Sequence, residues 1–291
     1  MHNIAKLNLY LNSLRSFLNK NSIEENYIPH LKSVLDSTPL FSVPIFNCPF
    51  YEVSRVTINR NVLDGKLERI YKPSLLKNPP KEKVTKLGRA NFIGQSIFYA
   101  AFDPLTIMDE LKPNVGDMLT ISKWQIKENS TLDISPIFKK TSGDNFSHNG
   151  LSLNFDVAFT NYINKNKEIN EELKEQIDIL LDFLAECFAK KVEKFNHFDY
   201  FLSAYFSNKI LYEFEDGTVE AIVYPSVQKK LSFSNIAIKP TSFDKKYSLF
   251  EVSESLVVSA PNINHLNGYI LNVTGHSKKF DFTNDLIIWD N

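Results

Sequence analysis

The sequence is poor in the residues that build disulfide frameworks and metal sites. Its two cysteines, Cys48 and Cys187, are far apart and form no C-x-x-C pair. This argues against a disulfide framework or a cysteine zinc site and favours a reducing cytoplasm. The histidines stand at positions 2, 30, 148, 197, 265 and 276 and show no H-x-x-x-H spacing. We therefore expect no metal in the protein.

The sequence also lacks an excess of one charge and any long apolar run. Its 33 basic and 34 acidic residues give a formal net charge of -1. Because no overall basic field is available to hold a phosphate polymer, we expect no direct nucleic-acid partner. No stretch approaches the roughly eighteen apolar residues of a membrane-spanning helix, and the start lacks the apolar core of a secretory signal. We expect neither a signal nor a membrane segment.

Glycine is scarce, and its placement excludes two common nucleotide-binding loops. None of the nine glycines falls in a G-x-G-x-x-G or a G-x-x-x-x-G-K-[ST] motif, so a Rossmann or P-loop protein is not expected. What is present is the composition of a globular protein, with 43% hydrophobic and 23% charged residues.

The N-terminal part, residues 1–48, is predicted to be a helical extension followed by a proline-rich connector. Apolar residues recur at helical spacing at 4, 7, 11, 14 and 18, and this stripe packs either on the chain's own body or on a partner. Prolines at 29, 39, 44 and 49 are typical of an extended connector.

The remainder predicts an α+β fold, because its strands and helices lack the regular alternation of a doubly wound protein. Residues 49–245 are predicted to form the main domain, and 246–291 are predicted to form a β extension that packs on it. Strands are predicted at 53–58, 96–101, 117–126, 130–134, 219–226 and 235–238, a loop at 139–150, and helices from Asp103 and at 168–194 and 198–213. We expect a mixed or antiparallel sheet with a helical pair inserted.

Four segments between residues 50 and 245 occur in a characteristic order. They are "YEVSRV" with Arg55, "LGRANFIG" with Arg89, "SIFYAAFDPLTIMDE" with Tyr99 and Glu110, and "IVYPSVQ...NIAIKP" with Ser226. As a set they resemble the RES family, which is named for an arginine, a glutamate and a serine. The resemblance implies a fold like that of ADP-ribosyltransferase toxins, with NAD as the substrate.

The resemblance also implies a function. RES toxins degrade NAD and arrest growth, usually beside a cognate antitoxin, and some related proteins are linked to ADP-ribosylation. We therefore expect a cytoplasmic enzyme that cleaves the nicotinamide–ribose bond of NAD by hydrolysis or phosphorolysis and needs no cofactor. Expected partners are a helix-turn-helix antitoxin and a second copy of the chain. The alternatives are an ADP-ribosyltransferase that modifies a protein and a non-catalytic nucleotide-binding module.

The basic and aromatic residues of these segments suit the diphosphate and the nicotinamide. The planar guanidinium groups of Arg55 and Arg89 can each donate two parallel hydrogen bonds to phosphate oxygens. Gly88 and Gly94 let the backbone around Arg89 approach the ligand closely. The ring of Tyr99 can lie against the cationic nicotinamide. The structural alternatives are a tight turn for the glycines and a core position for the tyrosine.

The acidic and hydroxyl residues suit the bond that is cleaved. Nicotinamide leaves as a neutral base, so no general acid is needed, and the Glu110 carboxylate can face the positive charge that develops on the ribose. Ser226 would orient the ribose or the amide and, with Glu110 and Arg55, completes the predicted catalytic set. Asn91 and Asn235 would brace these groups. A helix-surface glutamate paired with Arg55 and a simple strand-end serine are the alternatives.

Overall fold

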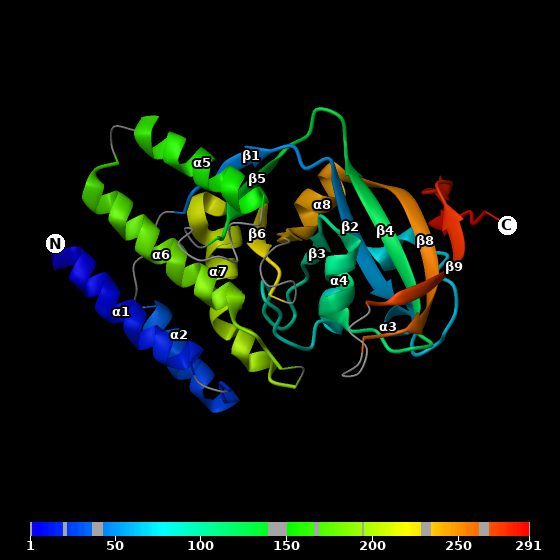
Figure 1. Cartoon of the computed structure of the whole chain (residues 1–291), viewed down its shortest axis with the longest axis horizontal. Coiled ribbons are helices and arrows are strands. Elements are labelled where there is room, and N and C mark those ends of the chain that lie inside the picture. Colours follow the sequence, from blue (N-terminus) through cyan, green and yellow to red (C-terminus); the bar gives the residue numbers. More distant parts are fainter. Residues whose placement is uncertain are drawn as a thin grey trace. The chain divides into compact units, whose positions relative to one another are not determined.

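The computed structural model describes residues 2–19, 22–36, 43–138, 150–165, 169–193, 195–227, 234–261 and 268–290. The chain forms two compact units, each assembled from three separate stretches (Figure 1). The sheet unit comprises Cys48–Pro79, Ile97–Leu132 and Asn235–Asn291, and the helical unit comprises Met1–Asn47, Pro80–Ser96 and Asp133–Ser234. Helices and strands alternate irregularly along the chain, so the predicted α+β class is confirmed.

The sheet unit is built around antiparallel strands in the order β7-β3-β2-β4-β8-β9. Their bounds are Ser234–Ile238 for β7, Phe98–Ala101 for β3, Glu52–Ile58 for β2, Met118–Ile126 for β4, Tyr247–Ser259 for β8 and Ile270–Ser277 for β9. A small hairpin, β10 (Phe280–Asp281) with β11 (Leu286–Ile287), follows β9. The unit also contains α3 (Asn59–Val62), the 3-10 turn Pro73–Leu76, α4 (Pro104–Leu111) and α8 (Pro240–Lys246).

The strand register defines two faces of this sheet. Ser54 pairs with Ala101, and Ala101 pairs with Asn235, so these three side chains share one face. That face carries α4, whose Met108 packs into a cluster with Val56. We call it the α4 face. The opposite side, the α8 face, buries Phe98, Trp124 and Phe243 as an aromatic group, and the rings of Phe98 and Phe243 stack 3.6 Å apart.

The helical unit combines helices with short strands. The strands, in the order β1-β5-β6, are Phe46–Cys48, Leu132–Pro136 and Ala221–Pro225, and β5 and β6 run parallel. The helices are α1 (His2–Leu18), α2 (Ile28–Asp36), α5 (Gly150–Lys165), α6 (Glu171–Ala189) and α7 (Phe201–Asn208), with shorter turns at Glu25–Tyr27, Lys81–Lys83, His197–Tyr200, Lys209–Glu213 and Phe214–Gly217. Helix α6 packs against β6.

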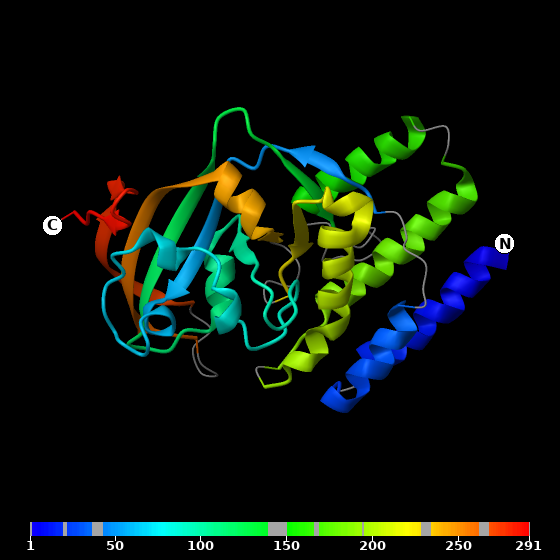
Figure 2. The same ribbon diagram turned by 180° about the vertical axis from the view of Figure 1, so that it is seen from behind.

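Helix α1 lies along α6 in both views (Figures 1 and 2). Arg15 of α1 donates from Nε to Glu186 of α6 at 2.7 Å, and Leu11 and Leu14 are fully buried. The apolar stripe predicted from the sequence therefore packs on the chain's own body.

The structure corrects two sequence-based expectations about helices. The expected connector contains a helix, α2, because Pro29 stands in its first turn, where a missing N–H costs nothing. Helices α5 and α8 were not expected. The predicted loop at 139–150 lies outside the described residues, except for Gly150, which begins α5.

The segments outside the predicted main domain fall in different units. Residues 1–47 contribute α1 and α2 to the helical unit, and residues 247–290 contribute β8 and β9 to the sheet unit. In the part of the chain that the structure describes, every helix is too short or too polar to cross a membrane.

Candidate functional site

Arg55 projects from the middle of β2 in the sheet unit. Its Nη1 donates to the carbonyl oxygen of Tyr99 at 2.9 Å, and its Cζ lies 5.5 Å from the centre of the Phe98 ring. Its Nε is buried without a hydrogen-bond partner, and within the described residues no carboxylate is paired with the guanidinium. Burial lowers the pKa of Arg55 to about 10, and the nearby Tyr99 opposes this shift. The group is thus a cation at neutral pH, held without a counter-charge.

The strands around Arg55 explain why its guanidinium sits there. β2 and β3 share a single residue pair, Ser54 with Ala101, whereas β2 is paired with β4 along its whole length. Beyond that pair, the Tyr99 carbonyl accepts a hydrogen bond from the Arg55 side chain. The guanidinium thus replaces the backbone N–H that a neighbouring strand would supply.

Glu110 reaches the sheet unit's α4 face from the last turn of α4. This helix starts at Pro104, directly after Asp103, as the sequence predicts. The Asp103 carboxylate accepts a hydrogen bond from Thr106 Oγ1 at 3.2 Å. The Glu110 side chain is exposed, and its Oε1 accepts a hydrogen bond from Asn235 Nδ2 at 2.8 Å. Asn235, on β7, is only 6% exposed, so a largely buried amide orients one oxygen of an exposed carboxylate.

The sheet register places the contact of Arg55 and the contact of Glu110 on opposite faces of the sheet. Asn235 and Ala101 share the α4 face, and Glu110 joins them there. Arg55 neighbours Ser54 on β2 and therefore points to the opposite, α8 face, consistent with its position over Phe98. The structure thus brings Arg55 to the backbone of Tyr99 and Glu110 to Asn235, but it does not pair Arg55 with Glu110.

Arg89 belongs to the helical unit, where it closes the C-terminal end of α6. Its Nη1 donates to the carbonyl oxygens of Phe188 and of Lys190, the latter at 3.2 Å, and its Cζ lies 4.9 Å from the ring of Tyr200. The last carbonyls of a helix have no intrahelical donors, so these bonds satisfy them. Arg89 is 9% exposed, and this arrangement gives it a structural task whether or not it binds a ligand.

The neighbouring predicted residues of the helical unit are also buried. Asn91 is 5% exposed and donates from Nδ2 to the carbonyl oxygen of Phe92 at 2.9 Å, so it braces the loop. Gly88 and Asn91 form an isolated bridge, and Gly94 has a φ of +74°, a conformation that favours glycine. Ser226 follows β6 and is wholly buried.

Two buried ion pairs escaped the sequence analysis. Lys190 donates to Asp199 at 3.0 Å in the helical unit, where Asp199 also accepts from the Ile23 amide at 2.7 Å. In the sheet unit, Arg69 donates to Glu254, which is 1% exposed, at 2.9 Å. A signal existed for Glu254, because it stands inside the predicted β segment 246–291 and shares a strand face with the apolar Val252 and Leu256, two positions away on either side.

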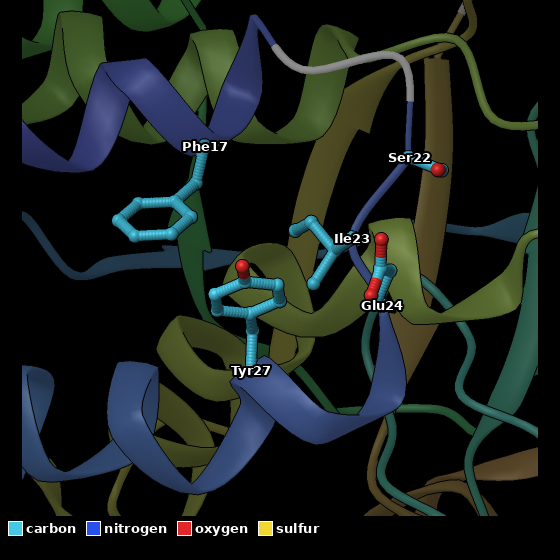
Figure 3. Close-up of a pocket in the computed structure, with 5 residues that line it drawn as sticks. All are labelled: Phe17, Ser22, Ile23, Glu24 and Tyr27. Carbon is cyan, nitrogen blue, oxygen red and sulfur yellow. The ribbon is translucent and has the colours of Figure 1, made fainter.

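A separate cavity of about 250 Å³ lies near the start of the chain in the helical unit. Figure 3 shows the rings of Phe17 and Tyr27 facing this space, with Ile23 beside them; Ser22 and Glu24 complete its lining. None of these residues was predicted to bind a ligand.

Among the described residues, no group of three or more histidine, cysteine, aspartate or glutamate side chains is arranged to hold a metal ion. Comparisons with protein-family models, with curated proteins and with solved structures find no match to this chain.

Proposed function

We propose that the protein is a RES-type, ADP-ribosyltransferase-like enzyme that degrades cytoplasmic NAD by cleaving its nicotinamide–ribose bond. The observation that carries this proposal is that segments of the RES-like motif which are distant in sequence contact each other in the structure. Arg55 contacts Tyr99, 44 residues away, and Glu110 contacts Asn235, 125 residues away. Residues that match the motif thus support one another in the sheet unit.

The state of Arg55 favours an anionic ligand at this place. Arg55 is partly buried, and a cation that is removed from water without a carboxylate is costly, so proteins normally pair such groups. A diphosphate would supply the missing charge and could accept two bonds from one guanidinium. Arg55 and Glu110 point to opposite faces of the sheet, so in this proposal NAD binds where β2 and β3 part, with its diphosphate at Arg55 and its nicotinamide ribose at Glu110.

Glu110 suits the cleavage step in this proposal. Its orientation is fixed by Asn235, so the carboxylate need not reorganise when positive charge develops on the ribose. Tyr99 would stack on the nicotinamide, and Ser226 would hold the ribose or the amide. The roles of Tyr99, Ser226 and Arg89 toward NAD stay predictions.

The direct test is release of nicotinamide when pure full-length protein is incubated with NAD. We expect turnover by the wild type and a loss of at least about a hundredfold with Glu110→Gln, which corresponds to roughly 2.7 kcal/mol of transition-state stabilisation. Glu128→Gln is the matched control, because Glu128 is an exposed glutamate of the same unit. Equal rates for the two variants would remove Glu110 from the mechanism.

The products separate the related reactions. ADP-ribose indicates hydrolysis, a phosphorylated ADP-ribose that appears only with added phosphate indicates phosphorolysis, and label transferred from adenine-labelled NAD to a protein indicates ADP-ribosylation. Tight NAD binding with no release in any variant would replace the enzyme by a nucleotide-binding module. Growth arrest on expression, relieved by a neighbouring helix-turn-helix protein, would support the toxin role.

A further inference from the structure

We propose that β9 is a self-association surface at which a second copy of this chain pairs edge to edge. β9 is the edge strand of the large sheet in the sheet unit, and β8 pairs with one of its edges. Along residues 269–273, the other edge pairs with no strand in the described part of the chain. The unpaired N–H and C=O groups of such an edge are a template for another strand.

The chemistry of this stretch favours pairing. Native edges are commonly protected by lysine, by proline or by a covering segment. The sequence "YILNV" at 269–273 contains no charge and no proline, and Ile270 and Val273 are 54% and 66% exposed. Protection begins only further along, where the Asp290 amide donates to the His276 carbonyl at 3.0 Å.

The side chains of residues 269–273 are complementary to the same residues in a second copy of the chain. Val273 pairs with Ser255 and Leu271 with Val257, so Leu271 and Val273 lie on the α4 face, where Tyr269 also packs. A two-fold axis through Leu271 would place Leu271 opposite its own copy and Tyr269 opposite Val273 of the second chain. Ile270 would lie opposite Asn272. These pairs are largely apolar and bring no like charges together, which favours an isologous antiparallel contact.

A β-bulge sets the limit of this pairing. The register shifts between Glu254 and Ser255, and the extra residue on β9 is Thr274. Arg69 Nη2 donates to the Thr274 carbonyl at 2.9 Å, so that acceptor is already used. The self-complementary stretch is therefore five residues long in each chain. Five residues in each chain bury less surface than a standard interface of about 1,200–2,000 Å². We therefore expect a weak, concentration-dependent dimer.

The first experiment measures sedimentation of the full-length protein over about a hundredfold range of concentration. We expect reversible dimerisation by the wild type and a dissociation constant raised about tenfold or more by Val273→Lys, which disrupts two cross-chain pairs. Val157→Lys is the matched control, because Val157 on α5 of the helical unit is 63% exposed. A wild type that stays monomeric, or equal effects of the two variants, would refute the proposal.

The second experiment tests the register. In a background without the native cysteines, Ile270→Cys and Asn272→Cys proteins are oxidised separately and as a mixture. Directly opposed residues have Cβ atoms about 5 Å apart, close enough for a disulfide after a small adjustment. We expect the mixture to form linked dimers faster than either variant alone. Equal rates in all three samples would contradict pairing about Leu271.

Discussion

The buried pair of Arg69 and Glu254 offers a quantitative test of what holds the sheet unit together. Glu254 Oε1 accepts hydrogen bonds from Arg69 Nε at 3.0 Å, from Arg69 Nη2 at 2.9 Å and from Thr274 Oγ1 at 2.9 Å. Its Oε2 is buried without a partner. Arg69 also lies 4.8 Å from the Trp289 ring, so the pair joins β8, β9 and the C-terminal residues.

Arg69→Ala would leave this carboxylate buried with only the Thr274 hydroxyl. Breaking a buried pair by removing one partner costs about 3–5 kcal/mol, because the remaining charge is uncompensated. That is a large fraction of the total stability of a typical domain, about 5–15 kcal/mol. Replacing both residues by leucine removes the charge as well, and we expect this double variant to regain most of the loss.

Urea unfolding followed by tryptophan fluorescence is a suitable assay, because Trp124 and Trp289 both belong to the sheet unit. Lys77→Ala is the control. Lys77 and Asp244 form a closer pair, at 2.6 Å, but their side chains are 40% and 52% exposed. We expect that substitution to cost at most about 1 kcal/mol. If Arg69→Ala cost no more than Lys77→Ala, the reasoning from burial would be wrong.

Three further predictions concern the ligand, a helix start and a helix end. Binding of ADP-ribose needs a protonated Arg55, whose pKa is about 10, so calorimetry should show constant affinity near neutral pH and weaker binding as pH rises through 10. Asn170 caps α6 by accepting from the Leu173 amide at 2.8 Å, and Asn170→Ala should lower the free energy of unfolding of the helical unit by about 1 kcal/mol in a circular-dichroism melt. Arg89→Lys should lower the melting temperature even without ligand, because a lysine lacks the fork that reaches two carbonyls, whereas an unchanged melt would show that helix closure is not its task.

The sequence predicted elements well where periodicity is long. Helix α6 was recognised because buried residues such as Ile177, Leu184 and Phe188 recur at helical spacing. Helix α8 was missed because its seven residues bury only one large apolar side chain, Phe243, and so show no period. Helix α2 was missed because Pro29 indicates a break in a helix. Proline interrupts a helix in its interior but is tolerated in its first turn.

The site could be predicted only in its local parts. The helix start at Asp103-Pro104 follows from local rules, and α4 begins at Pro104 as predicted. The bond between Glu110 and Asn235 depends on which strand lies beside β3, and pairing over 125 residues leaves no local signal. Arg89 shows the opposite difficulty, because glycines around an arginine suit a phosphate loop and a brace for a helix end equally well.

The short pairing of β2 with β3 connects these observations. If β2 and β3 were paired along their whole length, a backbone N–H would donate to the Tyr99 carbonyl. The Arg55 side chain could then not bind there. Because the strands share only Ser54 and Ala101, the chain instead keeps a desolvated guanidinium at the point where they part. Such an arrangement costs stability through the unpaired charge, and proteins accept local costs of this kind mainly where a ligand offsets them. Arg55→Met should therefore abolish ADP-ribose binding and leave the sheet unit at least as stable as the wild type. A large loss of stability would instead show that the role of Arg55 is structural.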